Sequence, residues 1–345
     1  MKKIYCILAA FILMLNAHAQ TNTAKYKVIK KISVSGDGGW DFLTIDEAAQ
    51  HLFLSHGSEV NVVDLKTDKT IFTIPDTKGV HGITIANDLN KGFISNGKDT
   101  SITVFDLKTF ATLEKVKIKG LNPDAILYDE FSHRVFSFNG KSNDATVLDA
   151  KTNKIIGSIN FEGKPEVAVT DGQGTIYVNI EDKSTITVID AMTMKIKNVW
   201  PLSPGVEPTG LALDVASGRL FSGCANKMMV VISAQNGKII NTLPIGDHCD
   251  GVAFDPEKKC VYVTNGEGTI TVAKEGNDRR FNVIETVLTQ KGAKTICLNT
   301  KNHCVYTPVA EFGESPEPTK DNPKPRPSII PNSFVVLVVE GNKGE

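Results

Sequence analysis

The sequence lacks the short motifs that mark several common kinds of site. No Cys-x-x-Cys pair occurs, and no cysteine–histidine spacing resembles a structural zinc site. The absence of Cys-x-x-Cys-His excludes a covalently attached c-type haem. No Gly-x-Ser-x-Gly sequence marks a nucleophile elbow. The glycine-rich stretch 36–39 lacks the Gly-Lys-Ser/Thr ending of a phosphate-binding loop and precedes an expected strand, not a helix.

The chain also lacks an excess of either charge and any long apolar run in its body. Its 38 Lys and Arg residues nearly balance its 39 Asp and Glu residues, giving a net charge of -1. No global field therefore attracts nucleic acid or an anionic membrane, and nucleic acid is not an expected partner. The apolar run 334–339 is short, which suits a strand that is buried on both faces.

The first 19 residues have the pattern of a secretion signal. Lys2 and Lys3 precede a mostly apolar stretch, 4–15, and Ala17-His18-Ala19 matches a small-x-small cleavage site. The apolar stretch is too short for a relaxed membrane span, which needs roughly 20 residues. We expect an exported protein, periplasmic or secreted, that starts at Gln20 with a short leader, 20–25, and has no transmembrane span after cleavage.

Five cysteines remain after this cleavage, and export permits disulfides among them. The predicted pairs are Cys297 with Cys304, across a short hairpin, and Cys224 with Cys249, in neighbouring repeats. The odd count leaves Cys260 as a buried thiol. The alternative is that several of these cysteines are simply small buried apolar residues.

A sequence motif recurs along the chain and is clearest at 184–195. It consists of a strand rich in β-branched residues followed by Asp-x-x-Thr. Strong copies reach their aspartate at Asp64, Asp106, Asp149 and Asp190, and weaker copies end at Ser233, Lys274 and Val338. A spacing of about 42 residues with four strand patterns per period is typical of propeller blades. The sequence therefore predicts an all-β fold, a seven-bladed β-propeller with four-stranded antiparallel blades. We expect the aspartates to accept backbone N–H bonds in turns.

The two ends of the repeat array predict how the propeller closes. The chain ends on a third strand, and an orphan strand at 26–34 precedes the first inner strand. We expect this N-terminal strand to complete the last blade and hide its open edge. The propeller would then span 26–340, with a proline-rich insertion at 308–332 and a tail at 341–345. The insertion either covers the channel mouth or forms an exposed extended loop.

The tetrad Tyr262-Val263-Thr264-Asn265 is the signature of YVTN-type β-propeller repeats. The segments 52–56 and 92–96 look like degenerate copies, and the Asp-x-x-Thr hairpins match as well. The resemblance covers nearly the whole mature chain and is greatest to exported, YncE-like members. It implies a propeller related to lactonases and to the haem d1 domain of nitrite reductases. The family has no single activity, and no catalytic residue transfers to this chain.

Aligning the inner strands places one residue of each blade at the mouth of the central channel. This ring consists of Asp41, His81, Asp124, Glu166, Thr209, Asp250 and Lys294. Loops expected on the same face add His56, Asn96, Asn139, Asn179, Cys224 and Asn265. Variation among repeats is where a symmetric scaffold departs from symmetry to gain a function. The opposite face carries the uniform Asp-x-x-Thr turns.

Several functions are compatible with such a mouth. Carboxylates and amides suit Ca²⁺ or another hard cation, whereas His81 and His56 with Asp41 suit a transition metal or acid–base chemistry. A water-filled channel without a ligand is the alternative. The leading hypothesis is a monomeric, non-catalytic propeller that binds an unidentified protein partner or small ligand. The other two are a lactonase-like hydrolase and a propeller that holds a redox cofactor non-covalently.

Overall fold

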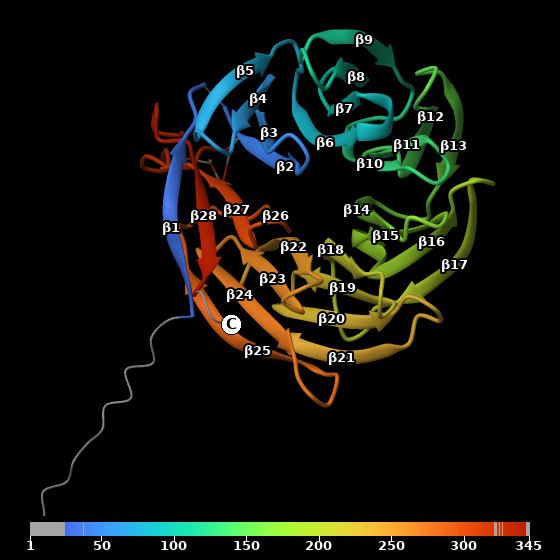
Figure 1. The fold of residues 1–345 in the computed structure, drawn as a ribbon, viewed down its shortest axis with the longest axis vertical. Coiled ribbons are helices and arrows are strands. Elements are labelled where there is room, and N and C mark those ends of the chain that lie inside the picture. The colour runs from blue at the N-terminus through green and yellow to red at the C-terminus, as the bar shows by residue number, and fades with distance from the viewer. Residues whose placement is uncertain (1–24, 37, 321–322, 324, 326, 343–345) are drawn as a thin grey trace, which may run out of the picture.

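The computed structural model describes residues 25–36, 38–320, 323, 325 and 327–342. The signal peptide predicted at 1–19, most of the leader and the end of the tail lie outside these residues. Seven sheets of four antiparallel strands surround a central axis (Figure 1). The predicted all-β, seven-bladed propeller is therefore confirmed. Within this part of the chain, no helix is long and apolar enough to cross a membrane.

The first three blades each contain four consecutive strands, ordered from the channel outward. Blade 1 contains β2 (Trp40–Asp46), β3 (His51–His56), β4 (Glu59–Asp64) and β5 (Lys69–Ile74). Blade 2 contains β6 (Val80–Ala86), β7 (Lys91–Asn96), β8 (Ser101–Asp106) and β9 (Thr112–Lys117), with the 3-10 turn η1 (Asn87–Leu89). Blade 3 contains β10 (Pro123–Asp129), β11 (Arg134–Asn139), β12 (Asp144–Asp149) and β13 (Ile155–Asn160).

The next three blades repeat this order. Blade 4 contains β14 (Pro165–Thr170), β15 (Thr175–Ile180), β16 (Thr185–Asp190) and β17 (Lys195–Pro201), with the 3-10 turn η2 (Glu181–Lys183). Blade 5 contains β18 (Pro208–Asp214), β19 (Arg219–Cys224), β20 (Met228–Ser233) and β21 (Ile239–Pro244). Blade 6 contains β22 (Cys249–Asp255), β23 (Cys260–Asn265), β24 (Thr269–Glu275) and β25 (Phe281–Leu288).

Blade 7 joins the two ends of the chain, as the sequence predicts. Its strands are β26 (Cys297–Asn299), β27 (Cys304–Val309), β28 (Val335–Gly341) and β1 (Tyr26–Ser33). β1 pairs antiparallel with β28 from Tyr26 opposite Gly341 to Ser33 opposite Val335. The backbone N–H of Tyr26 also donates to the Glu285 carboxylate of blade 6, 3.0 Å away. The N-terminal strand thus closes the ring and covers the edge of β28.

Packing between the blades depends on one aromatic side chain at the same place in every blade. The third residue of each second strand is aromatic and buried: Phe53, Phe93, Phe136, Tyr177, Phe221, Tyr262 and Tyr306. Its neighbours are the β-branched and leucine side chains of the second and third strands, which face apolar clusters on both sides of each sheet. This double burial explains why those strands have near-continuous apolar runs.

The repeated aspartates are structural, as predicted. The Asp190 carboxylate accepts N–H bonds from Met192 and Thr193, at 3.1 and 2.8 Å. Asp106 and Asp149 accept the corresponding N–H and hydroxyl bonds from Thr109 and Thr152. These turns end the third strands on the face opposite to the channel mouth, where they set the tight connection to the outermost strand.

Candidate functional site

The predicted ring residues lie inside the innermost strands and not just before them. Six of them hold the second position of an inner strand: Asp41, His81, Asp124, Glu166, Thr209 and Asp250. Lys294 lies before the short strand β26. In all six strands the pairing with the second strand shifts register at this point, for example between Trp40 and Leu43. Such an irregularity redirects a side chain, and here it occurs at the channel mouth.

Hydroxyl and amide side chains of neighbouring blades fix the backbone at these positions. The Ser95 hydroxyl accepts the Gly82 N–H and donates to the Asp124 carbonyl of the next blade. The Thr295 hydroxyl donates to the Asp41 carbonyl at 2.6 Å and so links blade 7 to blade 1. Because these bonds are buried or half-buried and cross from blade to blade, they make the mouth a rigid ring.

Three ring residues meet at one point of the mouth. His81 Nδ1 lies 2.6 Å from Asp41 Oδ2 and 3.6 Å from Asp124 Oδ1. One ligand atom from each residue lies within 4.8 Å of the other two, which is close enough for a single cation to contact all three. The three residues come from β2, β6 and β10, so adjacent blades assemble this cluster. The sequence alignment predicted its members, although not their contact.

Three further ion pairs, made by two lysines, extend the mouth around the channel. Lys164 Nζ lies 2.6 Å from Glu166 Oε1 and also pairs with Glu181. Lys294 forms a close ion pair with Asp250. Lys164 and Glu181 were missed from the sequence because they occupy connections that do not repeat between blades. The described part of the mouth therefore holds five carboxylates against His81 and two lysines.

Burial changes the protonation of these groups. Burial raises the pKa of Asp124 to about 6, with the charge of Asp41 adding to the rise against the opposing effect of His81. Burial and then the charge of Asp124 raise the pKa of Glu166 to about 8. Burial alone would lower the pKa of His81, but its hydrogen bond to Asp41 and the charge of Asp124 raise it overall. The negative charge of the ionised carboxylates at the mouth thus exceeds the positive charge of its histidine and two lysines.

The other predicted site residues have structural contacts. The Thr209 hydroxyl donates to the Cys249 carbonyl of the next blade at 2.8 Å. The buried amides of Asn96, Asn139 and Asn265 donate to threonine hydroxyls of their own blades. These asparagines end strands and turn inward, because that position lies within the pleat and not in a solvent loop.

His56 is also set apart from the Asp41–His81–Asp124 cluster. It is buried, its ring lies 4.2 Å from that of Phe334, and its Nδ1 lies 3.1 Å from Asn61 Oδ1. Asn179 is buried too and donates to the Thr209 carbonyl. The Asn179 amide is thus engaged by the backbone, whereas His56 lines a separate cavity together with Ile329 and Phe334.

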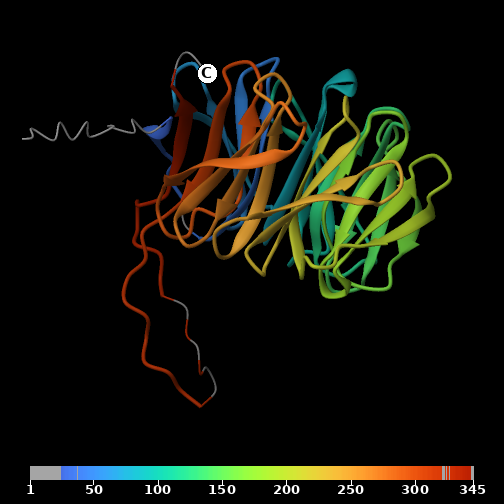
Figure 2. The ribbon, with the colours of Figure 1, turned by 90° about the horizontal axis from the view of Figure 1, so that it is seen from below.

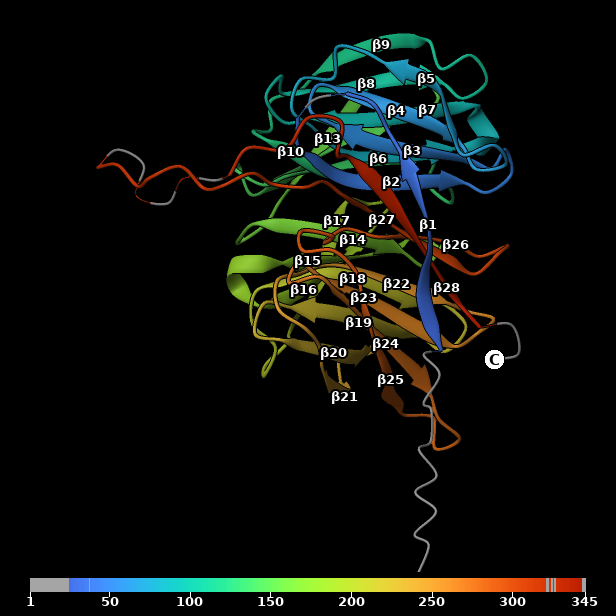
Figure 3. The ribbon, with the colours of Figure 1, turned by 90° about the vertical axis from the view of Figure 1, so that its left-hand side faces the viewer.

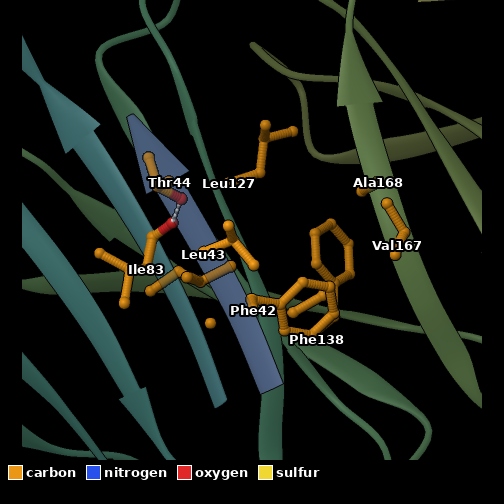
Figure 4. A pocket seen from close by; sticks show the side chains of 11 residues that line it. Phe42, Leu43, Thr44, Ile83, Leu127, Phe138, Val167 and Ala168 are labelled. Atoms are coloured by element: carbon orange, nitrogen blue, oxygen red, sulfur yellow. Dashed lines mark hydrogen bonds between the residues drawn. The ribbon is translucent and has the colours of Figure 1, made fainter. Parts of the chain in front are cut away.

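A cavity of about 160 Å³ is lined mostly by apolar side chains (Figure 4). Three of its lining residues, Phe42, Gly82 and Ala125, directly follow Asp41, His81 and Asp124 in the chain. Its wall is built from the inner strands of blades 1 to 4, with Phe42, Leu127, Phe138 and Val167 among the side chains. Phe42 belongs to blade 1 yet packs against the apolar cluster of blades 3 and 4. This cavity could not be predicted from the sequence, since each wall residue is an ordinary strand residue by itself.

The proline-rich insertion projects away from the propeller (Figures 2 and 3). Pro308 and Val309 still belong to β27, so the irregular part begins at Ala310. Its base is held by a bridge between Phe312 and Ile329, and the loop extends away from the body of the propeller in Figure 2. Of the two predicted arrangements, the structure has the exposed extended loop and not the cover.

Neither predicted disulfide is formed, because all five cysteines between Cys224 and Cys304 are free thiols. The strand register places Cys297 opposite Tyr306 and Cys304 opposite Asn299, so the two thiols are not directly paired. Cys224 and Cys249 belong to different apolar clusters. Cys260 is fully buried, as predicted.

Comparisons with known proteins confirm the fold. No protein-family model and no curated protein matches the chain. A hydrazine synthase structure from Kuenenia stuttgartiensis is similar, with a TM-score of 0.70 and 16% identity over 79% of this chain and 94% of that chain. The structure of U3-55K has a TM-score of 0.74 and 9% identity over 91% and 98% of the two chains.

A chain in the mitotic checkpoint complex structure has a TM-score of 0.73 and 12% identity, covering 96% of this chain and 99% of that one. At such low identities these likenesses show a shared propeller architecture and carry no activity with it. Any function of this chain has to be argued from the side chains at its own channel mouth.

Proposed function

We propose that this protein is an exported propeller, related to the YVTN-type repeat proteins, that binds a small cationic ligand at its channel mouth without transforming it. The tetrad 262–265 supports the relationship, and the pattern of residues 1–19 supports export. Binding can be tested with simple ions, because the site consists of charged side chains whose oxygen and nitrogen atoms converge on one point.

One observation carries the proposal: Asp41, His81 and Asp124 present ligand atoms to a common point. Among the described residues, the cations that act on the largely buried Asp124 carboxylate are His81, 3.6 Å away, and Lys164, which is itself paired with Glu166. A bound cation would offset the burial of this carboxylate and of Glu166, whose raised pKa values show that their ionised forms are under-compensated. Cation binding near neutral pH should therefore release protons.

Titration calorimetry with Mn²⁺ tests the proposal, because Mn²⁺ accepts both carboxylate and imidazole ligands. We expect Asp124→Asn and His81→Gln to weaken binding by about tenfold or more, the effect of losing one charged contact. Asp247→Asn is the matched control, since Asp247 is an acidic residue outside this cluster that pairs with Lys227. Equal Mn²⁺ affinity in the wild type and both cluster variants would disprove the site.

Export has its own test. Protein recovered from the exported fraction of cells that make the full chain should begin at Gln20 by N-terminal sequencing. Recovery of only intact chain from the cell interior would contradict this part of the proposal and leave the cation site unaffected.

A second candidate function, lactone hydrolysis, is favoured by the 2.6 Å contact between His81 and Asp41. A histidine oriented by a carboxylate is the arrangement of a general base that activates water. Hydrolysis of simple γ- and δ-lactones, followed by proton release, tests it. A rate that falls in His81→Gln supports hydrolysis, and a rate equal to the uncatalysed one rejects it.

A further inference from the structure

The residues of the mouth and of the cavity wall are neighbours along the inner strands. Phe42, Ala125 and Val167 line the cavity, and each directly follows a mouth residue, namely Asp41, Asp124 and Glu166. A strand advances about 3.3 Å per residue, so the apolar wall begins one residue step from the carboxylates. A molecule held at the mouth is therefore within reach of the cavity.

Most of the side chains that line the cavity are apolar, which suits an apolar group. Thr44 has the single polar side chain among the described residues that line it, and its hydroxyl donates to the Ile83 carbonyl (Figure 4). An apolar cavity of about 150 Å³ can hold benzene, and this one measures about 160 Å³.

We propose that the ligand is an organic ammonium ion whose compact apolar group, the size of one six-membered ring, enters this cavity. This inference rests on the proposed function and narrows its ligand class. The ammonium group has three N–H donors and can be shared by the carboxylates of Asp41 and Asp124, whose oxygen atoms face one point of the mouth. A metal ion would use the mouth alone and leave the cavity without an occupant.

Three probes separate the head group from the ring in calorimetric titrations: benzylamine, methylamine and benzyl alcohol. Benzylamine should bind about tenfold or more tightly than either fragment, because it combines the ion pair with burial of the ring. Benzyl alcohol that binds as well as benzylamine overturns the ammonium assignment. Methylamine that binds as well as benzylamine overturns the role of the cavity.

Ala168→Leu fills the cavity, since Ala168 lies in its wall and packs beside the cluster of blades 3 and 4. We expect benzylamine affinity to fall to that of methylamine, with methylamine affinity unchanged. Ala212→Leu in blade 5, outside the cavity lining, is the matched control. If Ala168→Leu does not fold, Ala125→Val makes a smaller filling of the same space. Unchanged benzylamine affinity in a folded filling variant overturns the inference.

The results also distinguish the two proposals. Mn²⁺ binding that depends on Asp124, without any amine binding, refutes the ligand class and retains the cation site. The absence of binding by Mn²⁺ and by all three organic probes refutes both.

Discussion

Two aspartates on opposite faces of the propeller show how position sets the sign of a carboxylate's effect on stability. Asp124 lies at the mouth, where burial raises its pKa to about 6. Asp190 lies in a turn, where Lys197 and the N–H of Thr193 lower its pKa to about 2. The first group opposes folding once it is ionised, and the second supports folding once it is ionised.

The Asp124→Asn variant should therefore be more stable than the wild type at pH 8, by on the order of 2 kcal/mol. The folded protein holds the Asp124 proton more tightly than the unfolded chain, so stability falls as pH rises from about 4 through about 6. The difference should vanish below about pH 3, where both states are protonated. Urea unfolding at the two pH values measures it.

Asp190→Asn is the control with the opposite sign. It should be less stable than the wild type at pH 7, and the deficit should shrink as pH falls through about 2. If both variants change stability in the same direction at every pH, the assigned difference between the two faces is wrong.

The thiols provide a second prediction at this scale. Burial raises the pKa of Cys224 and of Cys304 to about 11, so at pH 8 little thiolate is present and access is poor. A thiol reagent should react slowly with the native protein. After unfolding without reductant, all five cysteines from 224 to 304 should react, as peptide mapping can show. Any of them found in a bridge would contradict the structure.

The ring residues could be predicted from the sequence because they occupy one alignment position per blade. Their chemistry could not, because the contact of His81 with Asp41 and Asp124 depends on side chains from three blades. Asn96, Asn139 and Asn265 were misplaced since a polar residue before a turn looks exposed in sequence, whereas the pleat turns it inward. The alternation of residues in a sequence indicates where a strand runs. It does not show whether the residues at the ends of that strand are buried, because this depends on the neighbouring blades.

At the scale of elements, β1 has the clearest role. Ile32 is buried among side chains of blades 1 and 7, while Ile29 on the same strand is 43% exposed. The sequence predicted this strand from its position, as an orphan before the first blade, and not from any special composition. Its partner β28 would otherwise present an open edge.

Ile32→Ala should lower the free energy of unfolding by about 2–4 kcal/mol, since it leaves a cavity in the closure. Ile29→Ala should change it by less than about 0.5 kcal/mol. Deletion of residues 26–34 should cause aggregation or loss of a cooperative transition. Unchanged thermal melting in the deletion variant would refute the closure by β1.

The inner strands show the limit of strand prediction from sequence. The apolar pattern locates the cores of these strands correctly and predicts that they begin just after the ring residues, at Phe42 in blade 1 for example. In the structure each of the six strands starts two residues before that predicted start, ahead of the register shift. A propensity pattern ends where polar residues begin, whereas backbone pairing continues through Asp41 and its equivalents. The acidic side chains thereby gain the rigidity of a sheet, which is more accurate than a loop for holding a site.

At the scale of the whole molecule, the insertion meets the channel mouth at its root, where the ring of Phe312 lies 5.9 Å from that of Trp40. The insertion leaves β27 and returns to β28, and short backbone bonds at its base, such as Gly313 N–H to the Ser328 carbonyl at 2.9 Å, fix only its root. The binding site that we propose is complete without it. The two parts should therefore behave independently.

Joining Gly313 to Ser328 through two glycines removes the projecting part and tests this independence. The melting temperature should stay within about 2 °C of the wild type, because surface loop length has little effect on stability. Mn²⁺ affinity should also stay within about twofold, because the cluster of Asp41, His81 and Asp124 contains no residue of the insertion. Phe312→Ala, which alters the root but keeps the loop, separates effects of the base from those of the projection. A large loss of affinity on shortening, with Phe312→Ala unaffected, would mean that the projecting loop closes over the bound cation.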